Sequence, residues 1–183
     1  LALGVYITFR ILDIADMSID GSFVSGGAIC AILLIANVNP IIAITLATLS
    51  GLVAGLMTGI LITKFEIPSI LAGILTQLAL YSINLRIMGR ANISLLRVDT
   101  LFTNLSNKFN ISLTLASLIA GLIIVIIVIA FLYWFFGTEI GSSIRATGNN
   151  EKMVAAQGIS ISKTKILGLM LGNGLIALSG ALV

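Results

Sequence analysis

Long runs of apolar residues make up most of this chain, and short polar segments interrupt them at a few places. A helix needs about 20 apolar residues to cross the hydrocarbon layer of a membrane. By this measure the pattern predicts about six spans or partial spans, near residues 1–12, 19–36, 40–63, 68–88, 111–136 and 166–183. The sequence therefore predicts an all-α fold, a polytopic bundle of transmembrane helices.

The breaks between these runs contain turn-forming or charged residues. Asn37-Val38-Asn39-Pro40 divides a long segment without any charge, and proline at position 40 suits the first turn of a new helix. A short turn at 64–68 separates the next two spans. Residues 86–108, which are rich in Asn and Ser, form the longest connection. We expect that connection on the opposite side of the membrane from the 64–68 turn, because successive spans alternate in direction.

One polar segment, Gly141–Ile159, differs from every other part of the chain because it mixes charge, glycine and a short helical pattern. Asn149 or Asn150 is a suitable N-cap, Glu151 in the first turn favours the helix dipole, and Gly158 is placed to end the helix. A helix of two to three turns does not persist alone in water. We predict a loop that carries this helix across the membrane surface to a partner; the alternative is a solvated loop with an incidental helix.

The composition supports a membrane protein. Of 183 residues, 58% are hydrophobic and 9% are charged, whereas soluble domains carry about 25% charged residues. The net charge of +3 is small, and in a membrane protein it reflects loop topology. We therefore expect contact with membrane lipid and no binding of nucleic acid.

The sequence lacks the residues for three common kinds of site. There is no histidine, and Cys30 is the only cysteine, so histidine acid–base catalysis and an intrachain disulfide are excluded. The sequence lacks a GxxxxGK[ST] phosphate-binding loop. We expect no catalytic residue, no metal site and no cofactor bound by this chain, which is then not an enzyme.

Several polar residues stand inside or beside the apolar runs. Arg10, Asp13, Asp16 and Asp20 fall within eleven positions, and we expect such charges at an interface or in a water-filled cavity. Asp20 would also suit an N-cap of the next helix. For the other polar groups, interhelical hydrogen bonds are the alternative to a role in transport. The candidate pathway residues are Asp20, Ser22, Phe23, Gln77, Asn84 and Asn173.

Three glycines, Gly51, Gly55 and Gly59, recur at four-residue spacing within the third span. They fall on one helical face, and glycine allows a neighbouring backbone to come close. This spacing predicts a helix-packing face rather than a ligand site.

Two segments of the sequence resemble conserved parts of a known family. They are the polar segment GSSIRATGNNEKMVAAQGI, which continues into residues 165–182, and LDIADMSIDGSF at residues 12–23. In this order and at this separation they resemble the permeases of bacterial ABC importers, in the branched-chain amino acid and ribose permease superfamily. The DxSxDGSF form is closest to a subgroup that imports amino acids, including aromatic ones.

The resemblance covers the whole chain, which begins at Leu1 without a methionine and ends inside an apolar run. It implies one transmembrane permease domain, residues 1–183, truncated at both ends, with 141–159 as its cytoplasmic coupling loop. Residues implied to dock an ATPase are Arg145, Ala146, Gly148, Asn150, Met153, Val154, Ala155 and Gly158.

The same resemblance implies the permease subunit of a binding-protein-dependent importer in the bacterial cytoplasmic membrane. Its expected partners are two ATPase subunits, which would hold ATP and Mg, an extracellular solute-binding protein or lipoprotein, and a second permease copy. The expected action is ATPase-driven alternating access for a small solute, with an amino acid as the expected substrate.

Two other functional classes remain open from the residues themselves. An ion-coupled secondary transporter would favour broken helices with carboxylates at mid-membrane, whereas this sequence suggests amides at mid-span and carboxylates in loops. A non-transporting assembly subunit would not need a docking helix. The orientation is only weakly indicated, since six basic residues lie on the side of the polar segment and four lie on the other side.

Overall fold

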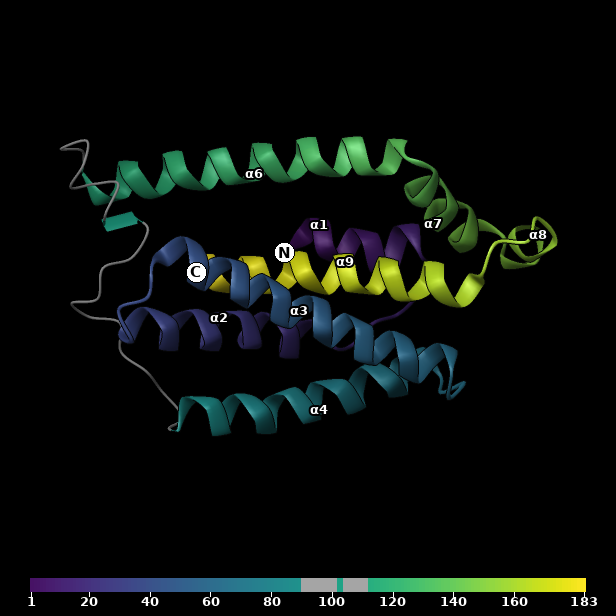
Figure 1. Cartoon of the computed structure of the whole chain (residues 1–183), viewed down its shortest axis with the longest axis horizontal. Helices are drawn as coiled ribbons and strands as arrows, with labels where there is room; N and C mark the ends of the chain where they lie inside the picture. Colours follow the sequence, from purple (N-terminus) through teal and green to yellow (C-terminus); the bar gives the residue numbers. More distant parts are fainter. Residues whose placement is uncertain (90–101, 104–111) are drawn as a thin grey trace.

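The computed structural model describes residues 1–89, 102–103 and 112–183, and all of the regular structure in these ranges is helical. The prediction of an all-α bundle is confirmed. The helices, labelled in Figure 1, are α1 (Ala2–Val5), the π-helix η1 (Tyr6–Ile11), α2 (Ile19–Ile35), α3 (Pro40–Thr63), α4 (Ser69–Met88), α6 (Leu113–Gly137), α7 (Glu139–Asn149), α8 (Glu151–Ala156) and α9 (Ile161–Leu182).

The long helices lie side by side along the longest axis of the molecule (Figure 1). The turn at 64–68 lies at the same end as α7 and α8, and the turn at 36–39 lies at the other end. Among the described residues, α3, α4, α6 and α9 are long and apolar enough to cross a membrane. In the predicted connection at 86–108, residues 90–101 and 104–108 lie outside the described residues.

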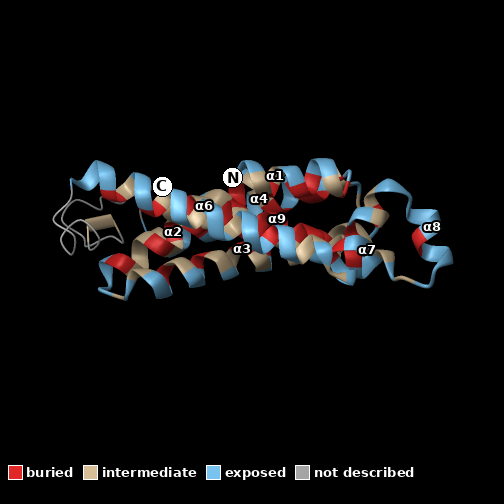
Figure 2. Cartoon of the chain, turned by 90° about the horizontal axis from the view of Figure 1, so that it is seen from above, coloured by how far each residue is buried: buried red, intermediate tan, exposed pale blue. Residues whose placement is uncertain are grey.

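Helix α9 occupies the centre of the bundle and contacts α3, α2, α1 and α7. Gly51, Gly55 and Gly59 of α3 face it. A Cβ added at Gly59 would lie 3.0 Å from the Cα of Ile166, and a Cβ added at either of the other two glycines would collide with backbone atoms of α9. Small residues allow this approach, and close packing replaces the hydrophobic effect within a membrane. Figure 2 shows the buried residues of α9 along its length.

Helix α9 begins at Ile161, five residues before the predicted start at Ile166. Lys163 and Lys165 therefore belong to its first two turns rather than to the preceding loop. Long lysine side chains can extend from a helix end to the aqueous interface while their stems remain against apolar surface. The two lysines therefore fit within the start of the helix, and treating their charges as part of the loop placed the start of the span too late.

The first helical segment is interrupted before α2 begins. Helix η1 ends at Ile11 and α2 starts at Ile19, with non-helical backbone at residues 12–18. A Cβ at Gly21 would lie 3.1 Å from the Cα of Gln77, near the middle of α4. The predicted span at 19–36 is therefore a shorter helix of 17 residues whose start lies at mid-height in the bundle. Irregular backbone at such a depth must be buried in protein or line a cavity.

This interruption changes the positions of the first four charged residues. Arg10 and Asp13 belong to the end near α7, since Gly148 of α7 packs against Ile11. Asp16 is fully buried, so neither the interface nor a water-filled cavity describes it. Asp20 does not cap α2: the N-cap is Ser18, and Asp20 lies in the first turn.

Candidate functional site

Helix α7 follows α6 directly, where the sequence suggested a loop. Thr138 is its N-cap and accepts a hydrogen bond from the Gly141 N–H through Oγ1, at 3.3 Å. Its Ser, Thr and Gly residues favour helix only weakly. Gly141, Ile144 and Thr147 nevertheless form one buried face at three-residue spacing. Packing of this face against the bundle overrides the weak propensity, so the expectation of a loop before residue 150 is wrong.

Three contacts fix α7 to the rest of the bundle. Gly148 lies so close to the carbonyl oxygen of Ile11 that any Cβ there would collide with it. Thr147 Oγ1 and Thr164 Oγ1 of α9 share a buried hydrogen bond of 2.9 Å. Arg145 Nη2 donates to the Phe136 carbonyl oxygen at 2.9 Å. Helix α7 is therefore joined to η1, to α9 and to the end of α6.

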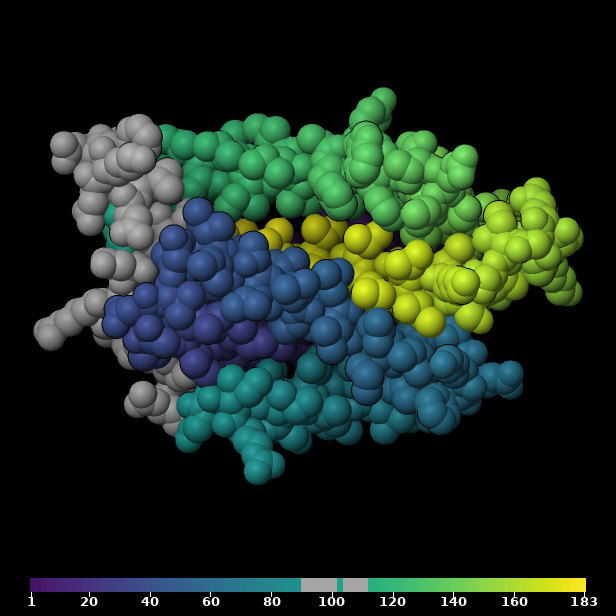
Figure 3. Space-filling model, viewed as in Figure 1, coloured from purple at the N-terminus to yellow at the C-terminus, as the bar shows by residue number. Residues whose placement is uncertain are grey.

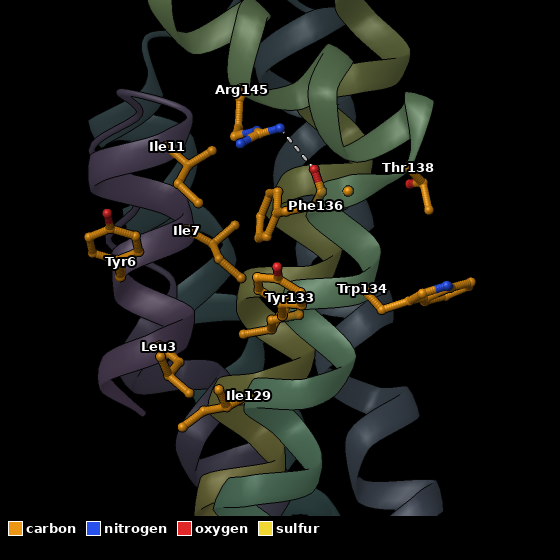
Figure 4. A pocket seen from close by; sticks show the side chains of 12 residues that line it. Leu3, Tyr6, Ile7, Ile11, Ile129, Tyr133, Trp134, Phe136, Thr138 and Arg145 are labelled. Atoms are coloured by element: carbon orange, nitrogen blue, oxygen red, sulfur yellow. Dashed lines mark hydrogen bonds between the residues drawn. The ribbon is translucent and has the colours of Figure 1, made fainter.

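Arg145 stands at the rim of a cavity of about 750 Å³ between α1, η1 and α6. Figure 4 shows Ile7, Ile11 and Phe136 around this cavity, with the guanidinium of Arg145 directed to the Phe136 carbonyl. The cation thus faces the end of α6 rather than the outer surface of α8. The sequence offered no signal for this cavity, because its wall comes from segments more than 100 residues apart.

Helix α8 is a six-residue helix that protrudes beyond the ends of the spans (Figures 1 and 3). Asn150 is its N-cap and accepts from the Met153 N–H at 3.1 Å. Gly158 ends the turn at a φ of +78°, which non-glycine residues rarely adopt. Glu151 forms an ion pair of 2.7 Å with Lys165 of α9. Helix α8 is shorter than the predicted two to three turns, and both of its ends are held.

The residues predicted to dock an ATPase divide into two groups. Val154 is fully buried and cannot touch a partner, whereas Met153 and Ala155 on either side of it are exposed. Lys152 and Ala156 lie about 200° around the helix from Val154 and are exposed as well. The other predicted residues build or attach the segment: Arg145, Ala146, Gly148, Asn150 and Gly158.

A second group of polar residues lies at the centre of the bundle and is fully buried. Asp16 accepts hydrogen bonds from the Ser18 N–H at 2.8 Å and the Ser18 hydroxyl at 2.6 Å, and from Asn173 Nδ2 at 2.7 Å. The Ser22 hydroxyl donates to Asn173 Oδ1 at 2.6 Å. Several hydrogen bonds compensate a buried carboxylate for lost water. This polar cluster, Asp16, Ser18, Ser22 and Asn173, joins the non-helical segment to α2 and α9.

Three of the predicted pathway residues line a groove between α2 and α4. Asp20, Gln77 and Asn84 form its polar part, and the groove has a volume of about 340 Å³. Ser22 and Asn173 belong instead to the buried polar cluster. Phe23 lies elsewhere, with its carbonyl against Gly180 of α9. The structure thus brings together three of the six residues in a groove and two in the core.

The complete chain, residues 1–183, matches the family described as "Branched-chain amino acid transport system / permease component". It is 45% identical to the "Tyrosine transport system permease protein" of Clostridioides difficile over all of this chain and 59% of that protein. It is 27% identical to the "Ribose import permease protein RbsC" of Escherichia coli, over 90% of this chain and 51% of that protein. An uncharacterized protein of Rickettsia prowazekii is 35% identical over the full chain and 62% of its own length.

The chain belongs to this family of transport-system permease components, a match that covers every residue. It spans about three fifths of the length of the two relatives most similar to it among these three. No solved structure matches it. The resemblance inferred from the two sequence motifs is therefore confirmed at the level of the family, including relatives in amino acid and ribose transport.

One argument from the sequence is wrong even though the family assignment is confirmed. Carboxylates were expected in loops, and that expectation counted against an ion-coupled transporter. Asp16 hydrogen-bonds Asn173 in the middle of α9, and Asp20 is one residue from Gly21, which packs against the middle of α4. The family match, and not the position of the carboxylates, indicates the class of protein.

Proposed function

We propose that the chain is the membrane-spanning part of a permease subunit in a binding-protein-dependent ABC importer that carries an amino acid. Partner ATPases bind ATP and Mg and receive α8 at the cytoplasmic face of the inner membrane. A solute-binding protein delivers the substrate at the opposite face, and a second permease copy completes the pathway. The permease moves solute by alternating access and makes or breaks no covalent bond.

The observation that carries this proposal is that α8 protrudes from the bundle while the helix next to it is firmly attached to the spans. The helix protrudes with Met153 and Ala155 exposed, and its neighbour α7 is fixed to η1, α6 and α9. A six-residue helix is not stable alone in water, so the attachment is what maintains it. A surface held in this way transmits a partner's displacement to the spans, which suits a coupling helix.

The test is capture of an ATPase by the full-length protein in detergent. Candidate ATPases are co-expressed with the wild type, with Ala155→Arg and with Ser142→Arg. Both substitutions place an arginine at an exposed small residue on the polar end, but Ser142 lies on α7 and outside α8. We expect Ala155→Arg to reduce the captured ATPase at least tenfold, because a bulky charge at a small contact residue removes complementarity.

Ser142→Arg should retain ATPase capture, which shows that the added charge alone is not responsible. Equal capture by wild type and Ala155→Arg would contradict docking through α8. Gly158 is avoided as a test position, because a side chain there would strain the backbone whether or not α8 docks.

A second candidate, an ion-coupled transporter, is favoured by one observation. The interruption at 12–18 and the mid-height carboxylates Asp16 and Asp20 match the discontinuous helices of that class. Amino acid uptake into vesicles distinguishes the two. Uptake that needs ATP and survives a proton or sodium ionophore supports the importer; uptake abolished by an ionophore supports ion coupling.

A further inference from the structure

The groove between α2 and α4 presents a carboxylate at a height where lipid would otherwise surround the protein. Asp20 is exposed, and its neighbour Gly21 packs against Gln77, the ninth of the 20 residues of α4. Ser22, two residues further on, bonds Asn173 near the middle of α9. An ionisable side chain at mid-span that is not buried in protein faces a water-filled cavity or solute route.

Asn84 supplies an independent sign that this groove receives a ligand. It is 3% exposed, and within the described residues neither its Oδ1 nor its Nδ2 has a hydrogen-bond partner. Buried amides without partners are unfavourable and rare in folded proteins. Asn84 lines the groove, so a polar group that enters the groove would satisfy it.

The groove has different chemistry along its length. Asp20 and Gln77 lie at one end, and Asn84 lies seven residues beyond Gln77, about 10 Å further along α4. Val24, Leu78 and Tyr81 form the wall between them, and all three are exposed. The volume of about 340 Å³ is at the low end of the range for small-molecule sites, about 300–1,000 Å³.

We propose that this groove is a solute-binding station that takes an α-amino acid whose aromatic side chain ends in a hydroxyl group. The proposal rests on the proposed function, in which an amino acid passes through this permease. The Asp20 carboxylate accepts hydrogen bonds from the ammonium group, and the Gln77 amide nitrogen donates to the carboxylate of the ligand. Tyr81, Leu78 and Val24 contact the ring, and Asn84 bonds the terminal hydroxyl.

Binding to the purified full-length permease tests the groove without any ATPase. Thermal unfolding is measured with increasing L-tyrosine, L-phenylalanine or D-ribose, because a ligand of the folded state raises the Tm. We expect L-tyrosine to stabilise more than L-phenylalanine at equal concentration and D-ribose to have no effect. A wild-type protein that neither amino acid stabilises, or that only D-ribose stabilises, overturns the proposal.

Three variants assign the two ends of the ligand. Asn84→Leu should weaken L-tyrosine binding about tenfold and leave L-phenylalanine binding unchanged, because only L-tyrosine has the hydroxyl. Asp20→Asn should weaken both about tenfold. Ser82→Ala is the control, since the Ser82 hydroxyl bonds the Leu78 carbonyl within α4 and does not line the groove. Unchanged binding of both amino acids by Asn84→Leu and Asp20→Asn contradicts the assignment.

Asn84→Leu also separates a ligand role from a structural one. Without ligand, this variant should unfold at the same or a higher temperature, since it removes an unpartnered buried amide. A large fall in its Tm without ligand would indicate that Asn84 is a structural residue, and would overturn its part in the proposal.

A labelling experiment tests water access in membranes. Val24→Cys and Val125→Cys are compared in a protein without native cysteines, with a membrane-impermeant maleimide. The two valines are similarly exposed, 48% and 51%, but Val125 lies at the middle of α6. We expect Val24→Cys to react and L-tyrosine to slow the reaction, with Val125→Cys unreactive. Equal, slow labelling of both overturns the groove as a solute route.

The ligand-binding experiments on the groove can succeed or fail independently of the ATPase capture described above. Ligand binding that depends on Asp20 and Asn84, combined with failure of Ala155→Arg to affect capture, retains the groove and rejects docking through α8. Capture that depends on Ala155, combined with variants that bind both amino acids as the wild type does, retains the importer and rejects the groove.

Discussion

Helices α6 and α9 are both long enough to span a membrane, but they occupy opposite environments. The most apolar stretch of 18 residues has a mean hydropathy of 3.2 in α6 and 1.5 in α9. Within that stretch, 17% is buried inside the bundle in α6 and 44% in α9. Figure 3 shows α6 along one edge of the molecule, with part of α9 visible between α6 and α3. The more hydrophobic helix is therefore the peripheral one.

The reason is that lipid chains are as apolar as leucine, so hydrophobicity alone does not draw a helix into a membrane bundle. Helix α9 buries Gly172, Asn173 and Ala177, which allow close approach and hydrogen bonds. Helix α6 instead exposes large aliphatic side chains along its length and ends with Tyr133 and Trp134, 86% and 66% exposed. These aromatics suit the membrane interface.

The largest effect should come from filling the contact between α3 and α9. Gly55→Leu would drive a side chain into the backbone at Leu169 and Met170. Overpacking against backbone, which cannot rotate away, should lower the free energy of unfolding by about 3 kcal/mol. Thermal unfolding of the full-length protein in detergent measures this.

Gly121→Leu in α6 is the matched control, because no atom of the described residues lies within 4 Å of the Cβ position there. It should leave the Tm unchanged or slightly raised, since leucine favours helix more than glycine does. If both glycine variants lose the same stability, the distinction between a packed α9 and a lipid-facing α6 is wrong.

A smaller loss should follow Asn173→Leu, which removes the amide that bonds Asp16 and Ser22. An oxygen of the buried Asp16 would lose its partner, at a cost of about 2 kcal/mol. Ser117→Leu in α6 should cost little, because among the described residues the Ser117 hydroxyl bonds its own helix alone, at the Thr114 carbonyl. Unfolding in detergent compares the two; equal stability of both variants with wild type would remove the polar cluster as a stabilising feature.

The smallest effect should come at the exposed start of α9. Glu151→Gln removes the ion pair with Lys165, whose members are 51% and 18% exposed, respectively. Exposed pairs contribute less than about 1 kcal/mol and are screened by salt. The Tm difference from wild type should be small at low salt and vanish at high salt. A loss as large as that of Asn173→Leu would mean that this end of α9 is as tightly packed as its centre.

The sequence was sufficient for the outline of the bundle. Apolar run lengths located the ends of α3 and α4 within a residue, and Pro40 marked the start of α3. These signals are local, since each depends on residues next to one another in the chain. The Asn150 cap of α8 was predictable for the same reason.

The features that the sequence did not reveal depend on distant segments. Helix α7 forms because Ile144 and Thr147 pack against the bundle. The weak helix propensity of its residues cannot reveal that packing. The polar cluster joins Asp16 to Asn173 across 157 positions. The groove required parallel packing of α2 and α4, which placed Asp20 beside Gln77 while Ser22 went to the core.

The contact of Gly148 with the Ile11 carbonyl leaves no clearance between the last turn of α7 and the end of η1. Helix α7 therefore cannot tilt inward unless the backbone after Ile11 moves with it. That backbone is the non-helical segment 12–18, which is tied to η1 by the N–H groups of Leu12 and Ile14 but does not continue its regular helical pattern. The far end of this segment contains Asp16 and leads into α2. A tilt of α7 would therefore displace the start of α2, which lies at mid-height in the bundle.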